Sequence, residues 1–141
     1  MTKTLETLIR LHQLTLDERR RELKVIQERE DDLRRRIENL AKRLVKEQKS
    51  AQENPEYASA YSQFAYWARG ENKRLVEAII ALQPELENAR DRMAEAFAEK
   101  KRVELTRDSR LEAEDTARKH REQIELDELG LQRHRRQQKE N

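Results

Sequence analysis

The sequence predicts an all-α fold, an antiparallel two-helix coiled-coil hairpin whose second helix is longer and overhangs the first. Charged residues make up 43% of the 141 residues and aromatic residues only 4%, which is typical of long helices. Apolar residues recur in alternating steps of four and three, the spacing of a coiled-coil seam. The only credible turn lies within residues 52–70, so we expect the chain to fold back once.

The first helix is predicted over residues 5–51. Thr4 can cap it, and Glu6 lies in its first turn, where the helix dipole favours an acid. Ten of fourteen seam positions are apolar, and the four polar ones weaken the seam. The fourteen positions are Leu5, Ile9, His12, Leu16, Arg19, Leu23, Ile26, Glu30, Leu33, Ile37, Leu40, Leu44, Glu47 and Ala51.

The turn is predicted at residues 52–55, and the second helix over residues 55–129. Asn54 can cap this helix, and Pro55 suits its first position because the missing N–H would have no partner there. The predicted seam comprises Tyr61, Phe64, Ala68, Glu71, Leu75, Ile79, Leu82, Leu86, Ala89, Met93, Ala96, Lys100 and Val103. Two steps of four in succession, from Glu71 to Ile79, should locally unwind the supercoil.

Pro84 predicts a bend in the second helix, because a proline removes one hydrogen bond and crowds the preceding turn. The seam resumes in phase after it, which favours a bent helix over a break into two helices.

A turn near Asn54 pairs residues whose numbers add up to about 108. Apolar residues then meet in each layer considered: Leu44 with Phe64, Leu33 with Leu75, Ile26 with Leu82, Leu16 with Met93, and Leu5 with Val103. Two chains pairing in parallel is the competing arrangement. The short connection favours the partner helix of the same chain, because it gives an effective concentration on the order of millimolar.

The second helix should overhang the first from about Thr106 to Leu129, a length of roughly 30–35 Å. Gly130 is a plausible helix stop, and residues 130–141 are predicted to form a flexible basic tail.

Composition argues against several classes of function. Lys and Arg number 31, Asp and Glu 29, and the signs are interleaved, as on a solvated helix face. The chain has no cysteine, and its longest apolar run, Ala78–Leu82, is too short to span a bilayer. The N-terminus lacks a signal peptide's apolar region, so we predict a cytoplasmic protein. No catalytic motif is present, and His12, His120 and His134 lie far apart, which predicts no enzyme, cofactor or metal site.

Five of the six aromatic residues lie near the predicted turn. Successive helical residues turn by about 100°, which places Tyr61 and Phe64 on the seam side, Tyr66 away from it and Trp67 beside it. Packing within the hairpin accounts for the first pair. It does not account for Tyr66 and Trp67, because a two-helix rod has no second layer, so we expect a partner-binding surface here.

A second candidate surface lies at the predicted open end. Leu8, Leu11 and Leu14 are outside the seam, and Phe97 should sit at their level. A wider core and a partner-binding surface are equally good interpretations of these residues.

Several motifs resemble the flagellar export protein FliJ family. They are Leu5-x-x-Leu8-Ile9-Arg10-Leu11, Leu16-Asp17-Glu18-x-Arg20-Arg21-x-Leu23 and, after a polar turn, Tyr61-Ser62-Gln63-Phe64. The resemblance covers nearly the whole chain and implies an antiparallel coiled coil similar to the central stalk of rotary ATPases.

It also implies a non-enzymatic stalk or adaptor at the cytoplasmic face of the flagellar basal body. Its partners would be the export ATPase ring, the cytoplasmic domain of the export gate and export chaperones. It would bind no nucleic acid and approach the membrane only through partners. The positions of Tyr61 and Phe64 match family aromatics and suggest gate contact, joined by Tyr66 and Trp67 from exposure alone. For the ATPase end, Leu8, Leu11 and Phe97 are candidates from the residues themselves.

Two other functions remain open at this point. The basic residues Arg133, Arg135, Arg136 and Lys139 could make a nucleic-acid-binding helical arm, although no aromatic residue is interleaved with them. A generic structural coiled coil that dimerises through its overhang is the other.

Overall fold

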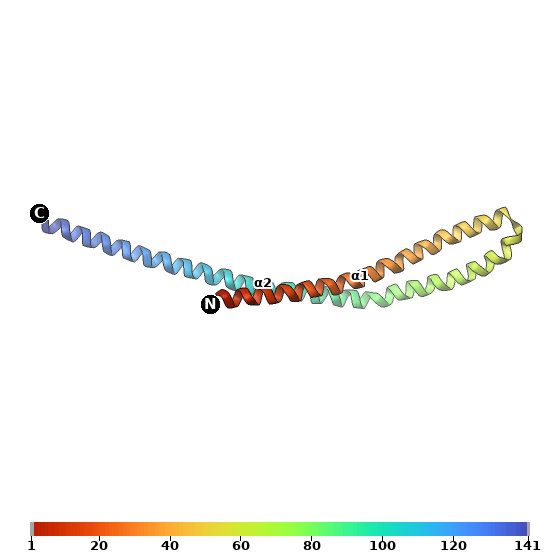
Figure 1. Ribbon diagram of the computed structural model, residues 1–141, viewed down its shortest axis with the longest axis horizontal. Helices are drawn as coiled ribbons and strands as arrows, with labels where there is room; N and C mark the ends of the chain where they lie inside the picture. The colour runs from red at the N-terminus through yellow and green to blue at the C-terminus, as the bar shows by residue number, and fades with distance from the viewer. Residues whose placement is uncertain (1, 141) are drawn as a thin grey trace. The chain divides into compact units, whose positions relative to one another are not determined.

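The computed structural model describes residues 2–140, with the side chain of Thr2 left out, and is entirely helical apart from its turn (Figure 1). Helix α1 spans Thr2–Glu53, the short 3-10 helix η1 spans Pro55–Tyr57, and α2 spans Ala58–Glu140. The chain reverses at Asn54, and α2 is much longer than α1. The predicted two-helix hairpin is confirmed.

The chain divides into two compact units. One combines the start of α1, up to Leu14, with α2 from Phe97 onward, and the other runs from Thr15 to Ala96. We call them the terminal unit and the hairpin unit.

In the hairpin unit, every predicted seam position is buried or half-buried. One core cluster near the turn is formed by Leu40, Ala68 and Leu75, with Leu33, Ile37, Leu44 and Phe64 packed against it. A second cluster is formed by Leu23, Leu86 and Ala89, with Ile26 and Met93 packed against it. Two predicted layers, Leu44 with Phe64 and Leu33 with Leu75, therefore lie within a single cluster.

Three of the four polar seam residues of this unit, Arg19, Glu30 and Glu71, are paired along their own helices. The Arg19 guanidinium lies 3.0 Å from the Glu22 carboxylate, and Arg34 reaches Glu30 at 2.7 Å. Pairs at such spacing stabilise a single helix by about 0.2–0.5 kcal/mol. The charges of these three seam residues are thus compensated within their own helices.

The helix ends differ from the predictions. Thr4, the predicted cap, lies inside α1, which begins two residues earlier at Thr2. Asn54 has the extended backbone of a cap residue, but its side chain makes no capping hydrogen bond. The turn is closed instead by backbone bonds from Asn54 N–H to the Ser50 carbonyl and from Tyr57 N–H to the Asn54 carbonyl, both 3.0 Å.

Helix α2 continues through Pro84, as favoured, and also through Gly130, where a helix end was predicted. Pro84 lies inside one continuous helix, so the alternative of a break into two helices is wrong. Gly130 does not end the helix either, since α2 continues to Glu140. Nothing lies within 4 Å of the place where a Cβ would sit on Gly130, and its φ is not positive. No packing or backbone strain therefore forces the chain out of the helix there.

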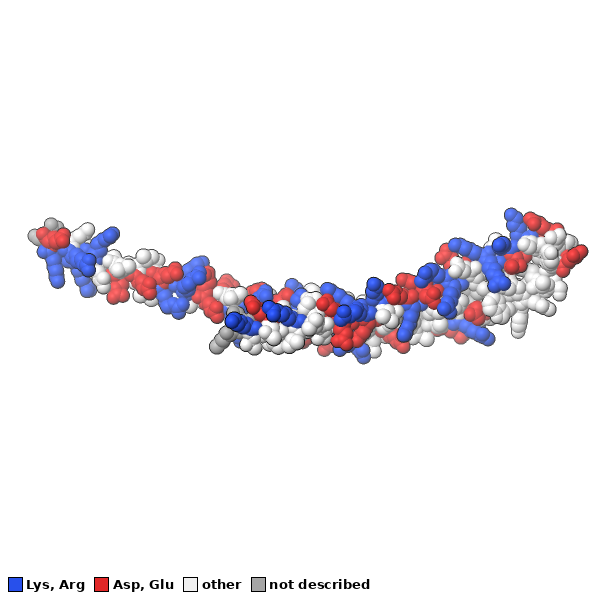
Figure 2. All heavy atoms as spheres, viewed as in Figure 1, with Lys and Arg blue, Asp and Glu red and all other residues white. Residues whose placement is uncertain are grey.

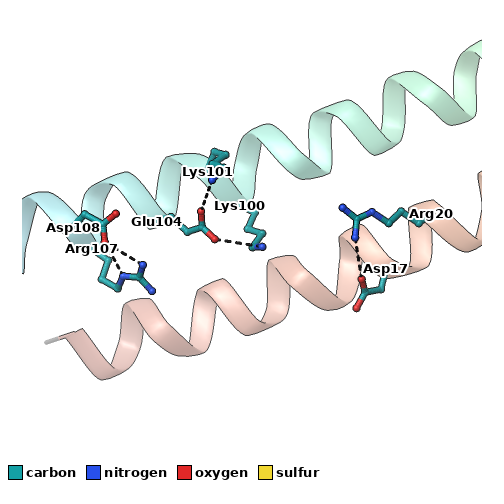
Figure 3. Close-up of polar contacts among 7 residues, drawn as sticks. All are labelled: Asp17, Arg20, Lys100, Lys101, Glu104, Arg107 and Asp108. Carbon is teal, nitrogen blue, oxygen red and sulfur yellow. Dashed lines mark hydrogen bonds and ion pairs between the residues drawn. The ribbon is translucent and has the colours of Figure 1, made fainter.

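The terminal unit has a short paired part and a long unpaired one. The first turns of α1 lie beside α2 near Arg107 (Figures 1 and 3), with Leu5 buried and Val103 half-buried. From residue 108 to residue 140, all α2 side chains except Asp115 are exposed. These 33 residues (140 − 108 + 1) make a single helix about 50 Å long. We call residues 108–140 the lone helix.

Candidate partner-binding surfaces

The four aromatic candidates near the turn fall into two pairs by exposure. Tyr61 and Phe64 are half-buried on the seam, and Phe64 packs against the core cluster near the turn. Tyr66 is 81% exposed and Trp67 51% exposed, which agrees with their predicted helical directions. Only the second pair presents most of its ring surface to a partner.

Trp67 is held in place by the core through Phe64. The two ring centroids are 5.8 Å apart with the planes tilted by 36°, a favourable arrangement for aromatic pairs. From α1, the Arg43 guanidinium lies over the Phe64 ring, 4.6 Å from its centroid, a cation–π contact between the helices. The exposed indole therefore rests on a ring fixed from both helices.

A groove on α2 lies beside these rings. It has a volume of about 520 Å³ and runs along Tyr66, Gly70 and Arg74, residues four apart on one side of the helix, with Trp67 at its edge. The charged residues that line the groove are three cations, Arg69, Lys73 and Arg74, and one acid, Glu71. Because Gly70 has no side chain and nothing lies near its missing Cβ, the groove is open at its middle.

Trp67 also lines a smaller groove, of about 270 Å³, between the two helices of the hairpin unit. Arg36 and Arg43 of α1 contribute cations to that groove. An exposed indole between two cationic grooves suits a partner that offers both apolar and acidic side chains.

In the terminal unit, Leu8 is 39% exposed, Leu11 54% and Phe97 46%. All three belong to this one compact unit, as the pairing of residue numbers predicted. The Lys101 ammonium lies 5.8 Å from the centroid of the Phe97 ring. These side chains supply apolar surface on both helices, next to charged groups.

Glu104 lies among those charged groups. Its carboxylate accepts from Lys101 at 3.2 Å and lies 3.4 Å from the Lys100 ammonium (Figure 3). The hydrogen bond from Lys101 is the largest of the effects that lower the pKa of Glu104 below its ordinary value of 4.5. Desolvation opposes it, and the hydrogen bond from Lys100 adds to the lowering. Arg107 and Asp108 make a further pair on α2, 3.1 Å apart (Figure 3). The surface is therefore charged at neutral pH but locally balanced.

Elsewhere, charges of both signs are interspersed over the face shown in Figure 2, and the largest uncharged area on that face lies near the turn. Over residues 2–140, no group of three or more His, Cys, Asp or Glu side chains is placed to hold a metal ion. None of the described helices has a stretch long and apolar enough to cross a bilayer.

The sequence interpretation did not find Gly70 or Arg43 as parts of the aromatic surface. A signal existed for each. Gly70 is a glycine inside a strongly helical segment, four residues after Tyr66, which points to an opening on the Tyr66 side. Arg43 follows from the pairing sum of about 108, which places it opposite residue 65, next to Phe64.

Comparison with known proteins identifies a family. The model of the family described as flagellar FliJ protein matches residues 1–139, nearly the whole chain. Neither a curated protein nor a solved structure matches it. The family consists of non-catalytic flagellar export proteins. On this match, the chain belongs to the flagellar FliJ protein family and is a component of the flagellar export apparatus.

Proposed function

We propose that the chain is a stalk and adaptor of the flagellar type III export apparatus, coupling the export ATPase ring to the cytoplasmic domain of the export gate. The observation that carries the proposal is the aromatic pair Tyr66 and Trp67, which is exposed beside a cationic groove. The rest of the hairpin surface is mostly charged, so two exposed aromatic rings side by side stand out as a binding surface. Exposed Tyr and Trp are the residues most often used as binding anchors. Membership of the family supplies the apparatus in which the partners lie.

The proposed gate surface comprises Tyr61, Phe64, Tyr66 and Trp67. Tyr66 and Trp67 are its exposed members, and Phe64 holds Trp67 from the seam. The Phe64–Trp67 ring contact fixes the indole before the partner arrives, which lowers the entropy lost on binding. The cations of the groove favour an acidic partner surface.

The ATPase surface comprises Leu8, Leu11 and Phe97 in the terminal unit. The charged sides of the helices make local ion pairs with their own neighbours, such as Arg36 with Asp32 and Lys42 with Glu38. Such sides offer mainly charged groups that are already paired, so the chain can shift or turn between its two partners. Export chaperones are further partners in this proposal, and the chain itself catalyses no reaction.

The test is a pull-down with the export ATPase and, separately, with the cytoplasmic domain of the export gate. Tyr66→Ala with Trp67→Ala should weaken gate binding by about tenfold or more and leave ATPase binding unchanged. The triple variant Leu8→Ala, Leu11→Ala and Phe97→Ala should weaken ATPase binding and leave gate binding unchanged.

A matched control is Val45→Ala with Ile80→Ala, since these side chains are also apolar, are 66% and 63% exposed, and lie outside both surfaces. It should leave both interactions intact. Unchanged gate binding in the Tyr66/Trp67 variant would remove the assignment of the gate surface.

A further inference from the structure

The lone helix carries its charges in blocks. Acids occupy residues 122–128, and four cations with no acid occupy residues 132–139 (Figure 2). Almost all of these side chains are exposed. Solubility alone does not require charges of one sign to be grouped, and elsewhere in this chain the two signs are interspersed. The separation into blocks therefore requires another explanation.

On one side of the lone helix, the charged residues of one stripe lie at equal distances in sequence before and after Leu129, and the two members of each such pair have opposite charge. Glu125 and Arg133 lie four residues before and after it. Glu122 and Arg136 lie seven residues away, and Arg118 and Glu140 eleven. At about 100° per residue, all six lie within roughly 40° of the direction of Leu129. The stripe is therefore self-complementary: reversing it end to end brings each charge opposite its counterpart.

The same stripe is hollowed at its centre. A groove of about 500 Å³ is lined there by Leu126, Leu129 and Gly130, with Arg133 and Arg136 at one side. Leu129 is 60% exposed and Leu126 62% exposed, so both apolar side chains are free to meet a second surface. Gly130, turned about 100° from Leu129, adds no side chain to the side of this groove, and nothing occupies the space of its missing Cβ.

We propose that the lone helix binds a second copy of this chain, antiparallel, about a two-fold axis at Leu129. Leu129 then meets its own counterpart, and Leu126 of each copy lies opposite Gln132 of the other. Each of the three opposite-charge pairs occurs twice by symmetry, as in any two-fold interface. The proposal is independent of the gate and ATPase surfaces, because none of their residues lies in the stripe.

The occupant is a second copy because the complementarity includes both signs. A purely acidic partner would match Arg133 and Arg136 but would meet Glu122 and Glu125 with like charge. Within one chain, Arg118 also lies 3.8 Å from Glu122 and is paired with Asp115 at 2.5 Å. These local pairs compete with the outermost intermolecular pair, Arg118 with Glu140. We therefore expect Glu122, Glu125, Arg133 and Arg136 of each copy to contribute most of the attraction between the two copies.

The association should be weak and strongly dependent on salt, because exposed ion pairs contribute little each and few apolar side chains are buried. Sedimentation of the full chain from about 1 μM to about 1 mM should show dimers at roughly 0.01 M ionic strength, where the Debye length is ~30 Å, and monomers at ~1 M, where it is ~3 Å.

Charge reversal provides the sharper test. Glu122→Lys with Glu125→Lys should weaken self-association by roughly tenfold or more, as should Arg133→Glu with Arg136→Glu. Mixing these two variants should restore a heterodimer, because every inner pair becomes complementary again. The matched control, Asp127→Lys with Glu128→Lys, changes the net charge equally but lies about 100° or more from the direction of Leu129, and should remain dimeric.

The absence of cysteine allows an independent check of the axis. Under a mild oxidant, Leu129→Cys should form a disulfide-linked dimer, since the axis brings two copies of that position together. Leu131→Cys, turned about 160° away, should cross-link far more slowly. Monomers under all conditions, equal cross-linking of the two cysteine variants, or capture of an acidic peptide through Arg133 and Arg136 without self-association would each overturn the proposal.

Discussion

Leu16 has the most protected large side chain of the described chain, with 1% of its surface exposed. Its depth is notable because two helices give each seam residue only one facing surface. One turn later on the same seam, Arg19 is half-buried and its guanidinium is held by Glu22. A long side chain that lies along the seam in this way covers apolar surface with its methylene groups while its charge stays in water.

Leu16→Ala should therefore lower the free energy of unfolding by about 2–5 kcal/mol, the range for a buried leucine that leaves a cavity. A two-helix structure can collapse around the site, which favours the lower part of that range. The measurement is chemical unfolding followed by circular dichroism at fixed protein concentration. Val45→Ala, at a residue 66% exposed, is the control and should stay within about 0.5 kcal/mol of the parent.

At the scale of the element, α2 keeps its helix through a proline. Pro84 has no N–H to offer the Ile80 carbonyl, four residues earlier, and its ring crowds that turn. The Gln83 side chain donates to the neighbouring Ile79 carbonyl at 3.2 Å. Leu82 and Leu86 on either side are both buried, so packing against α1 holds the helix where local preference opposes it. The bend predicted at this position remains a prediction.

Pro84→Ala should raise the free energy of unfolding, by up to about 3 kcal/mol, because it restores one hydrogen bond and removes the crowding. Thermal unfolding followed by circular dichroism would measure the gain. Gln83→Ala is the control and should change stability little, since it removes one exposed side-chain bond without altering the backbone ladder. A Pro84→Ala protein no more stable than the parent would show that the backbone is already relaxed there.

At the scale of the whole molecule, the seam could be predicted from the sequence because burial in a two-helix structure follows directly from spacing. Even Arg19 and Glu30 lie on the seam as predicted, since position on the helix outweighs polarity when both neighbouring layers are apolar. The helix ends could not be predicted, as Thr4 and Gly130 show. A cap residue or a glycine permits an end but does not impose one. The groove beside Trp67 was also missed, because spacing gives a side chain's direction and not the ring contact with Phe64 that holds it.

Stability is distributed unevenly along the chain. Residues of the seam are protected by packing, whereas the lone helix depends on its own hydrogen bonds and on local pairs such as Lys119 with Asp115, 3.0 Å apart. The hydrogen bond from Lys119 lowers the pKa of Asp115, but exposed pairs of this kind add little to stability. Isolated helices in water open easily, even when their residues favour the helix.

Hydrogen exchange of the full chain at low micromolar concentration should therefore find fast exchange from residue 108 to residue 140 and slow exchange around Leu23, Leu40, Leu75 and Leu86. Raising the concentration at low salt should slow exchange around Leu129 alone, since a second copy would cover that stripe and leave the seam unchanged. The charge-reversed variant Glu122→Lys with Glu125→Lys is the control, and its exchange should not depend on concentration. Equal protection of the lone helix and the seam at every dilution would contradict this distribution, because a helix without a partner has no packing to slow its opening.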